Sequence, residues 1–143
     1  MSGGFRFTLR TRVDFSDTDV TGVVYYGRYP VLFDRAVVAY RRHLGVDLLG
    51  PDGHHYLIRA LAAQYHGSLR FDDEIDIHVR ISRIGRTSHS YDLRVDRVNG
   101  DGRVHCVDGQ ITIVGVDGYG EQASPSSMPA DLRRRIEEFE GAG

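Results

Sequence analysis

The chain contains a single cysteine, Cys106, among its 143 residues. One cysteine cannot form a disulfide within the chain, and Cys106 has no companion at the spacing of a metal-binding pair. We therefore expect a protein of a reducing compartment, the cytoplasm, in which Cys106 is a small buried hydrophobic side chain.

Long hydrophobic runs are also absent. Residues 1–7 lack the apolar stretch of a secretory signal, and no run approaches the roughly 20 apolar residues that a membrane-spanning helix needs. Eighteen basic residues against twenty acidic ones give a net charge of -2, so no general positive field attracts nucleic acid or an anionic membrane. We expect no nucleic acid partner and no membrane insertion, and any anionic ligand must be bound by local groups.

Motifs for metals and nucleotide cofactors are missing too. The histidines form no H-E-x-x-H motif and no paired Cys and His pattern, so we expect no zinc site. His66 falls on an expected strand, is the histidine closest to the expected cleft, and is assigned a structural role. No P-loop and no G-x-G-x-x-G motif follows an expected strand, which argues against nucleotide cofactors bound in those ways.

Length and composition, with 41% hydrophobic residues, indicate one domain over residues 1–143. Apolar residues recur at steps of three and four after Tyr29 and predict a helix of about four turns. Pro30 suits the first turn of this helix, and Gly45 is a suitable stop. The apolar stripe consists of Phe33, Ala36, Val37, Tyr40 and Leu44.

A loop from Leu49 to His55 then leads to segments in which the hydrophobic period is two, as in half-buried strands. With an opening strand they predict a five-stranded antiparallel sheet packed on the long helix, an α+β fold. A short amphipathic helix with Leu132, Ile136 and Phe139 follows. The expected strands cover residues 7–15, 56–69, 75–81, 91–95 and 104–116.

The segment 13–29 is the most informative part of the chain, because Asp17 and Asp19 lie in a turn just before the long helix. Such acids most often cap a helix, but a reactive carboxylate beside unpaired backbone N–H groups is also suited to attack on a carbonyl. The same residues imitate the first half of a calcium loop. Its twelfth position would require Glu and is occupied by Arg28, so calcium is not expected.

The order of strand, acidic turn, helix and four strands resembles the hot-dog fold, and its motifs resemble those of the 4-hydroxybenzoyl-CoA thioesterase family. The D-x-D-x-x-G-x-V-Y-Y signature lies at 17–26, with Tyr29 after it. An R-x-D-D segment lies at 70–73, a G-R-T-S turn at 85–88, and a proline-led closing helix at 128–139.

This resemblance implies that Asp19 is the catalytic carboxylate and that the N–H of Tyr26 faces the thioester oxygen. Asp19 could act as nucleophile or as general base, and the sequence does not separate the two. Asp17 is assigned a cap or supporting role. Residues expected around the substrate are Asp17, Gly22, Val23, Tyr25 and Tyr29, although tyrosines at such positions are as often core residues.

For the nucleotide end of coenzyme A, we expect contacts from Arg83, Arg86, Thr87 and Ser88. Guanidinium groups and a glycine turn suit phosphate oxygens, while a plain solvated hairpin is the alternative. The family also implies a homodimer or homotetramer with each site built by two chains, which would hide an exposed sheet edge.

The predicted function is hydrolysis of an acyl-CoA thioester to free acid and coenzyme A, without cofactor or metal. The alternatives are a non-catalytic acyl-thioester-binding protein and a hydrolase of acyl-carrier-protein thioesters. Hot-dog dehydration chemistry would need a helix histidine, and His43 lies at the wrong end. Asp34 and Tyr26 depart from residues common in the family, so the sequence does not predict which acyl group the protein accepts.

Overall fold

The computed structural model describes residues 4–46 and 54–141. Within these ranges the fold has two helices and six strands, together with three single 3-10 turns, η1 (Phe15–Asp17), η2 (Tyr26–Arg28) and η3 (Gly120–Gln122). Most of the predicted loop from Leu49 to His55 lies outside the described residues, and His54 opens a strand. In chain order the elements are β1 (Phe7–Arg12), α1 (Tyr29–Leu44), β2 (His54–Tyr65), β3 (Glu74–Ile84), β4 (Ser88–Asn99), β5 (Gly102–Asp117), β6 (Ser124–Pro125) and α2 (Ala130–Glu140).

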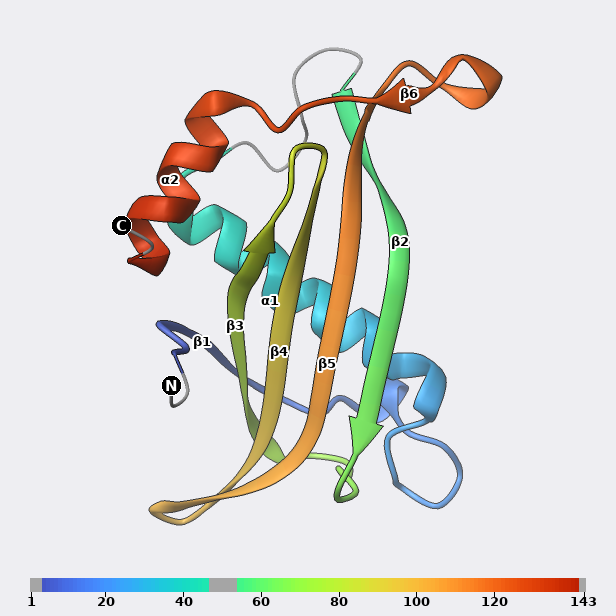
Figure 1. The fold of residues 1–143 in the computed structure, drawn as a ribbon. Helices are drawn as coiled ribbons and strands as arrows, with labels where there is room; N and C mark the ends of the chain where they lie inside the picture. Colours follow the sequence, from blue (N-terminus) through green and yellow to red (C-terminus); the bar gives the residue numbers. More distant parts are fainter. Residues whose placement is uncertain (1–3, 47–53, 142–143) are drawn as a thin grey trace.

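One antiparallel sheet carries the fold, in the order β1-β3-β4-β5-β2, and the short β6 pairs with β5 beyond the five predicted strands. The sheet is curled, and α1 crosses one of its faces while α2 lies beside its upper end (Figure 1). This arrangement confirms the predicted α+β fold class. None of the helices in the described ranges is long and apolar enough to cross a membrane.

The boundaries of α1 follow from its sequence. Pro30 occupies the first turn, where its missing N–H costs nothing, and Gly45 ends the helix in the left-handed conformation with φ 73°. The apolar stripe faces the sheet, and Phe33 and Tyr40 are fully buried. Gly109 of β5 allows this close packing, because a Cβ at that position would lie 2.7 Å from the ring of Phe33.

The two edges of the sheet differ in character. β1 is a six-residue strand on which Arg10 and Arg12 present charge, which is a common way to protect an edge. β2 is twelve residues long and exposes apolar side chains. These are Leu57, Ile58, Leu61 and Tyr65, which are 47%, 65%, 48% and 53% exposed.

Candidate active site

Asp17 is an internal anchor of the acidic loop. Its side chain is fully buried, and its Oδ2 accepts the N–H of Asp14 at 2.9 Å. The guanidinium of Arg28 donates to Oδ1 at 3.2 and 3.1 Å. The loop is thereby tied to the residue that precedes α1, and Asp17 contributes no exposed surface to a ligand.

Asp19 lies two residues further on and points to solvent. The backbone forms a narrow hairpin here, in which the N–H of Asp19 donates a hydrogen bond to the carbonyl of Val23 at 2.9 Å. The N–H and the hydroxyl of Thr21 donate to Oδ1 of Asp19 at 2.8 and 2.6 Å. The Thr21 hydroxyl, followed by its N–H, lowers the pKa of the Asp19 carboxyl. Asp19 is therefore an oriented, ionised carboxylate on the surface of the loop.

Tyr26 begins the 3-10 turn η2, which runs directly into α1. The long helix therefore begins three residues after Tyr26, a detail that helical periodicity does not resolve. The first N–H groups of such a turn have no partner within it. In the described part of the chain, the N–H groups of Tyr26 and Gly27 donate to no acceptor.

A hollow of about 300 Å³ lies next to these groups. Tyr29 is buried, and its ring centroid lies 4.9 Å from that of Tyr65. Burial raises the pKa of the Tyr29 phenol to about 12, so it stays neutral. The lining residues come from the acidic loop, the start of α1 and the end of β2, and they are Val23, Val24, Tyr26, Tyr29, Tyr65, Gly67 and Ser68.

Only part of the predicted substrate set lines this hollow. Val23 and Tyr29 do, Gly22 forms the turn beside Asp19 with φ 80°, and Tyr25 is exposed with its ring against Tyr26. Tyr65, Gly67 and Ser68 were not predicted from the sequence. They are distant from the acidic turn along the chain. Backbone hydrogen bonds from Val24 N–H to Leu69 O, at 2.8 Å, and from Phe71 N–H to Gly22 O, at 2.9 Å, hold their segment against it.

The predicted nucleotide residues lie at the opposite end of the sheet, in the hairpin between β3 and β4 (Figure 1). Ser88 is level with Val114, which pairs with Leu57 of β2, whereas the hollow adjoins Tyr65 at the other end of that strand. Eight residues of strand separate these two levels by roughly 26 Å. Within one chain, the predicted carboxylate and the predicted phosphate contacts are therefore not brought together.

The hairpin itself is firmly held. Gly115 donates its N–H to Thr87 O at 2.8 Å, and Met128 donates its N–H to Arg86 O at 3.1 Å. Arg86 also reaches Ser127 Oγ at 3.4 Å, while the side chain of Arg83 is exposed. The turn thus presents arginine side chains from a rigid support.

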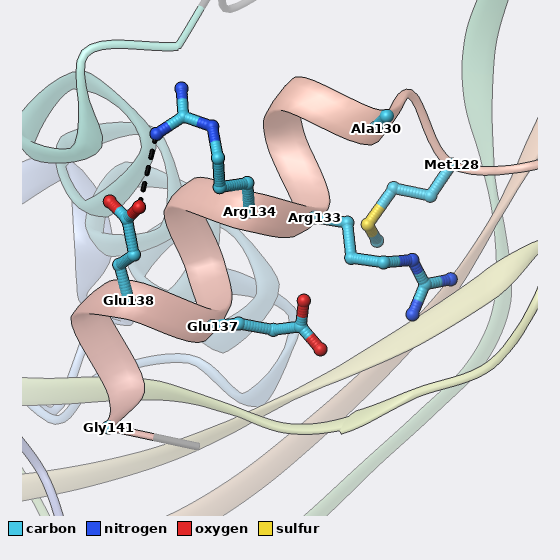
Figure 2. Close-up of a pocket in the computed structure, with 7 residues that line it drawn as sticks. All are labelled: Met128, Ala130, Arg133, Arg134, Glu137, Glu138 and Gly141. Carbon is cyan, nitrogen blue, oxygen red and sulfur yellow. Dashed lines mark hydrogen bonds and ion pairs between the residues drawn. The ribbon is translucent and has the colours of Figure 1, made fainter. Parts of the chain in front are cut away.

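A larger hollow, of about 580 Å³, lies along α2 but contains none of the predicted site residues. Figure 2 shows Arg134 bridged to Glu138 on one side of the helix, while Arg133 extends away from it. Arg133 donates to Gly85 O at 2.8 Å and so supports the β3–β4 hairpin. Size alone therefore does not locate the candidate site.

The sequence from residue 21 to residue 104 matches the family described as the thioesterase superfamily. The chain belongs to the thioesterase superfamily. The acyl-CoA thioester hydrolase YbgC of Escherichia coli is 26% identical over 132 residues, which cover 90% of this chain and 96% of that protein. The acyl-CoA thioesterase YbgC of Haemophilus influenzae is 30% identical over 100 residues, 68% of this chain and 72% of that protein.

Solved structures agree with this thioesterase fold. A mutant 4-hydroxybenzoyl-CoA thioesterase in complex with 4-hydroxybenzoyl-CoA superposes with a TM-score of 0.82 at 22% identity, covering 91% of this chain and 97% of that one. The 4-hydroxybenzoyl-CoA thioesterase of a Pseudomonas species has a TM-score of 0.79 at 23% identity, and the match covers 90% of this chain and 97% of that one. The predicted family is confirmed, and with it the enzyme class, a thioester hydrolase.

Proposed function

We propose that this protein is an acyl-CoA thioesterase in which Asp19 acts on the thioester carbonyl and the N–H of Tyr26 binds the developing oxyanion. The observation that carries the proposal is the position of Asp19. It is an exposed carboxylate, oriented by Thr21, on the hairpin that supplies Val23 to the tyrosine-lined hollow. The YbgC relatives are named as acyl-CoA thioester hydrolases or thioesterases, which supports coenzyme A as the group that carries the acyl chain.

The chemistry needs few groups. The Asp19 carboxylate attacks the carbonyl carbon and expels the coenzyme A thiolate to leave an anhydride, which water then hydrolyses; alternatively it removes a proton from the attacking water. Either route converts thioester and water to acid and thiol. The negative oxygen of the tetrahedral intermediate would lie at the N–H groups that open η2, where the positive end of the helix dipole also stabilises it.

We further propose that the functional unit is a dimer paired through β2. The long apolar edge of this strand is complementary to a second copy of itself, and the neighbouring helix surface is apolar as well. A hollow of about 340 Å³ there is lined by Pro30, Val31, Asp34, Ile58, Leu61 and Ile111. Antiparallel pairing of two β2 strands would satisfy their free backbone groups and cover this surface.

Such a dimer would bring the separated halves of the site together. A two-fold axis reverses the direction of β2, so the upper end of the partner lies beside the lower end of this chain. The β3–β4 hairpin of the partner, with its Arg83 and Arg86, would then approach the Asp19 loop. Asp19 of one chain and the phosphate-binding arginines of the other would form one site.

Free-thiol release from a panel of short aliphatic, long aliphatic and aromatic CoA thioesters tests the enzymatic proposal. We expect wild-type protein to turn over at least one member and Asp19→Asn to lose about 100-fold or more in kcat while it stays folded. Asp101→Asn, which removes an exposed carboxylate from the β4–β5 turn, is the matched control. Equal turnover by wild type and Asp19→Asn would remove Asp19 from the mechanism, and acyl-CoA binding without turnover would favour a binding protein.

A further inference from the structure

Two histidines share one carboxylate at the ends of β2 and β5. Nε2 of His66 lies 3.0 Å from Oδ2 of Asp108, and Nε2 of His105 lies 2.9 Å from Oδ1 of the same group. The two imidazole rings are 4.9 Å apart between centroids, and the ligand atoms of the three residues all lie within 4.8 Å of one another. Three groups that ligate metals therefore converge on one point.

A bulge in β5 creates this convergence. Asp96 of β4 is opposite His105 and Val95 is opposite Val107, so Cys106 is an extra residue in β5. In a regular strand, residues three apart point to opposite faces of the sheet. The inserted residue turns His105 to the same face as Asp108.

The backbone fixes His66 at this bulge. The N–H groups of His66 and Gly67 both donate to the carbonyl of Cys106, at 2.7 and 3.1 Å. Phe33 of α1 approaches the neighbouring Gly109, so alternation along β5 places Asp108 on the face away from the helix. The cluster is open to solvent there, with side chains of His66, His105 and Asp108 that are 44%, 33% and 45% exposed.

A second carboxylate in the same sheet shows what distinguishes the cluster. Asp96 also accepts from a histidine, His78, at 3.0 Å, but its other oxygen is bound by the guanidinium of Arg94 at 2.9 Å. Arg94 is opposite Asp108 in the strand register, yet its Nε bonds to Asp96. The Asp108 carboxylate thus has imidazole partners on both oxygens, and imidazoles can give up a proton for a metal.

We propose that His66, His105 and Asp108 form a binding site for one divalent transition-metal ion of the zinc type. Two imidazole nitrogens and a carboxylate oxygen are a common ligand set for Zn²⁺, with a fourth tetrahedral position left to water. Zn–N and Zn–O bonds near 2.0–2.2 Å place ligand atoms about 3.3 Å apart, so the exposed side chains must close around the ion from separations of up to 4.8 Å.

The ion would tie the end of β2 to the bulge of β5. Tyr65 and Gly67 on either side of His66 line the tyrosine-lined hollow, while the imidazole itself meets Asp108 on the other face of the sheet. The metal is therefore a structural tie behind the hollow and takes no part in the proposed hydrolysis. His66 is far from the His105-x-x-Asp108 segment along the chain, so no local motif indicates this site, and the sequence predicted no zinc site.

Titration of chelator-treated protein with Co²⁺, followed by its visible absorption and by competition with Zn²⁺, tests this site directly. We expect one Co²⁺ per chain in the wild type and binding at least about tenfold weaker in His66→Gln and in His105→Gln. His78→Gln is the matched control, since it removes an imidazole that also bonds to a carboxylate, and it should bind Co²⁺ as the wild type does.

Thermal unfolding gives a second measurement. Zn²⁺ should raise the Tm of the wild type and of His78→Gln but not of His66→Gln, because an ion that binds only the folded state stabilises it. Asp108→Asn keeps both histidines and should also weaken metal binding. It replaces a histidine variant in both measurements if that variant does not fold. No saturable binding in the wild type, or equal affinity in the His66, His105 and His78 variants, would overturn the proposal. Neither measurement depends on thioesterase activity.

Discussion

The guanidinium of Arg28 donates two hydrogen bonds, of 3.2 and 3.1 Å, to Oδ1 of Asp17. Asp17 is fully buried, while Asp19, only two residues away, is exposed. The two acids of the D-x-D motif therefore have separable roles. The Asp17–Arg28 pair holds the loop to the start of α1, and it leaves Asp19 on the surface beside the hollow.

Asp17→Asn should lower stability, whereas Asp19→Asn should not. An amide at position 17 places its NH2 group against either the N–H of Asp14 or the guanidinium of Arg28, so a buried donor loses its acceptor. The expected cost is about 2–3 kcal/mol, as for hydrogen bonds to charged groups. Urea unfolding of both variants measures it, and Arg28→Met should behave like Asp17→Asn. A larger loss of stability in Asp19→Asn than in Asp17→Asn would contradict this division.

Much of the fold could be predicted from local pattern. The stripe from Phe33 to Leu44 and the stop at Gly45 identified α1 almost to the residue, because apolar spacing and a left-handed glycine are local signals. The alternating segments likewise became β3, β4 and β5. These three strands are longer than predicted, because charged residues such as Arg97 extend the pairing, whereas β1 and β2 end earlier than predicted, at Arg12 and Tyr65.

The arrangement of the site depends on non-local pairing and could be predicted only in part. The motif predicts Asp19 and Tyr26 as site residues, but nothing in the spacing indicates that the arginine hairpin with Arg86 is separated from them by most of the length of β2. No sequence pattern indicates the bulge at Cys106 either. Such features arise from strand register, which no local pattern encodes.

Below pH 6.5 the protein should lose stability through His89. This side chain is 2% exposed, its Nε2 has no partner, and burial, with the nearby Arg41 charge, lowers its pKa to about 4. The unfolded chain takes up the proton near pH 6.5 and the folded chain only near pH 4, so the unfolded state binds more protons between these values. The free energy of unfolding therefore decreases as the pH is lowered through this range. The loss should be about 3 kcal/mol by pH 4.

His89→Leu removes this titration, so comparison of its pH profile with that of the wild type isolates the effect. Urea unfolding between pH 4 and 7 gives both curves, and the difference between the two proteins should grow as the pH falls. His43→Gln, which alters an exposed histidine on α1, should leave the wild-type profile in place. Parallel profiles for wild type and His89→Leu would show that His89 does not titrate in this way.

Ile58→Asp should convert the proposed β2-paired dimer to a monomer without unfolding the chain. Ile58 is 65% exposed within one chain, so a carboxylate there is solvated in the monomer but would be buried against a second β2 in the dimer. Sedimentation velocity measures the state, and thioesterase activity should fall with the dimer. Ser82→Asp adds the same charge at an exposed position of β3 and should stay dimeric. A wild type that is monomeric at assay concentrations while fully active would contradict the two-chain site.

Mixing two impaired variants tests whether Asp19 and Arg86 act across the proposed dimer. Arg86→Ala should raise KM for a CoA thioester by about tenfold and leave KM for a truncated thioester without the nucleotide unchanged, because only the former contacts the guanidinium. In a heterodimer of Asp19→Asn and Arg86→Ala chains, one site would combine the intact Asp19 of one chain with the intact Arg86 of the other. After full exchange, half of the dimers are heterodimers, so about a quarter of all sites should regain wild-type kcat/KM at low substrate. If both residues served the same site from one chain, no wild-type site could form, and the mixture would show only the mean of the two separate activities.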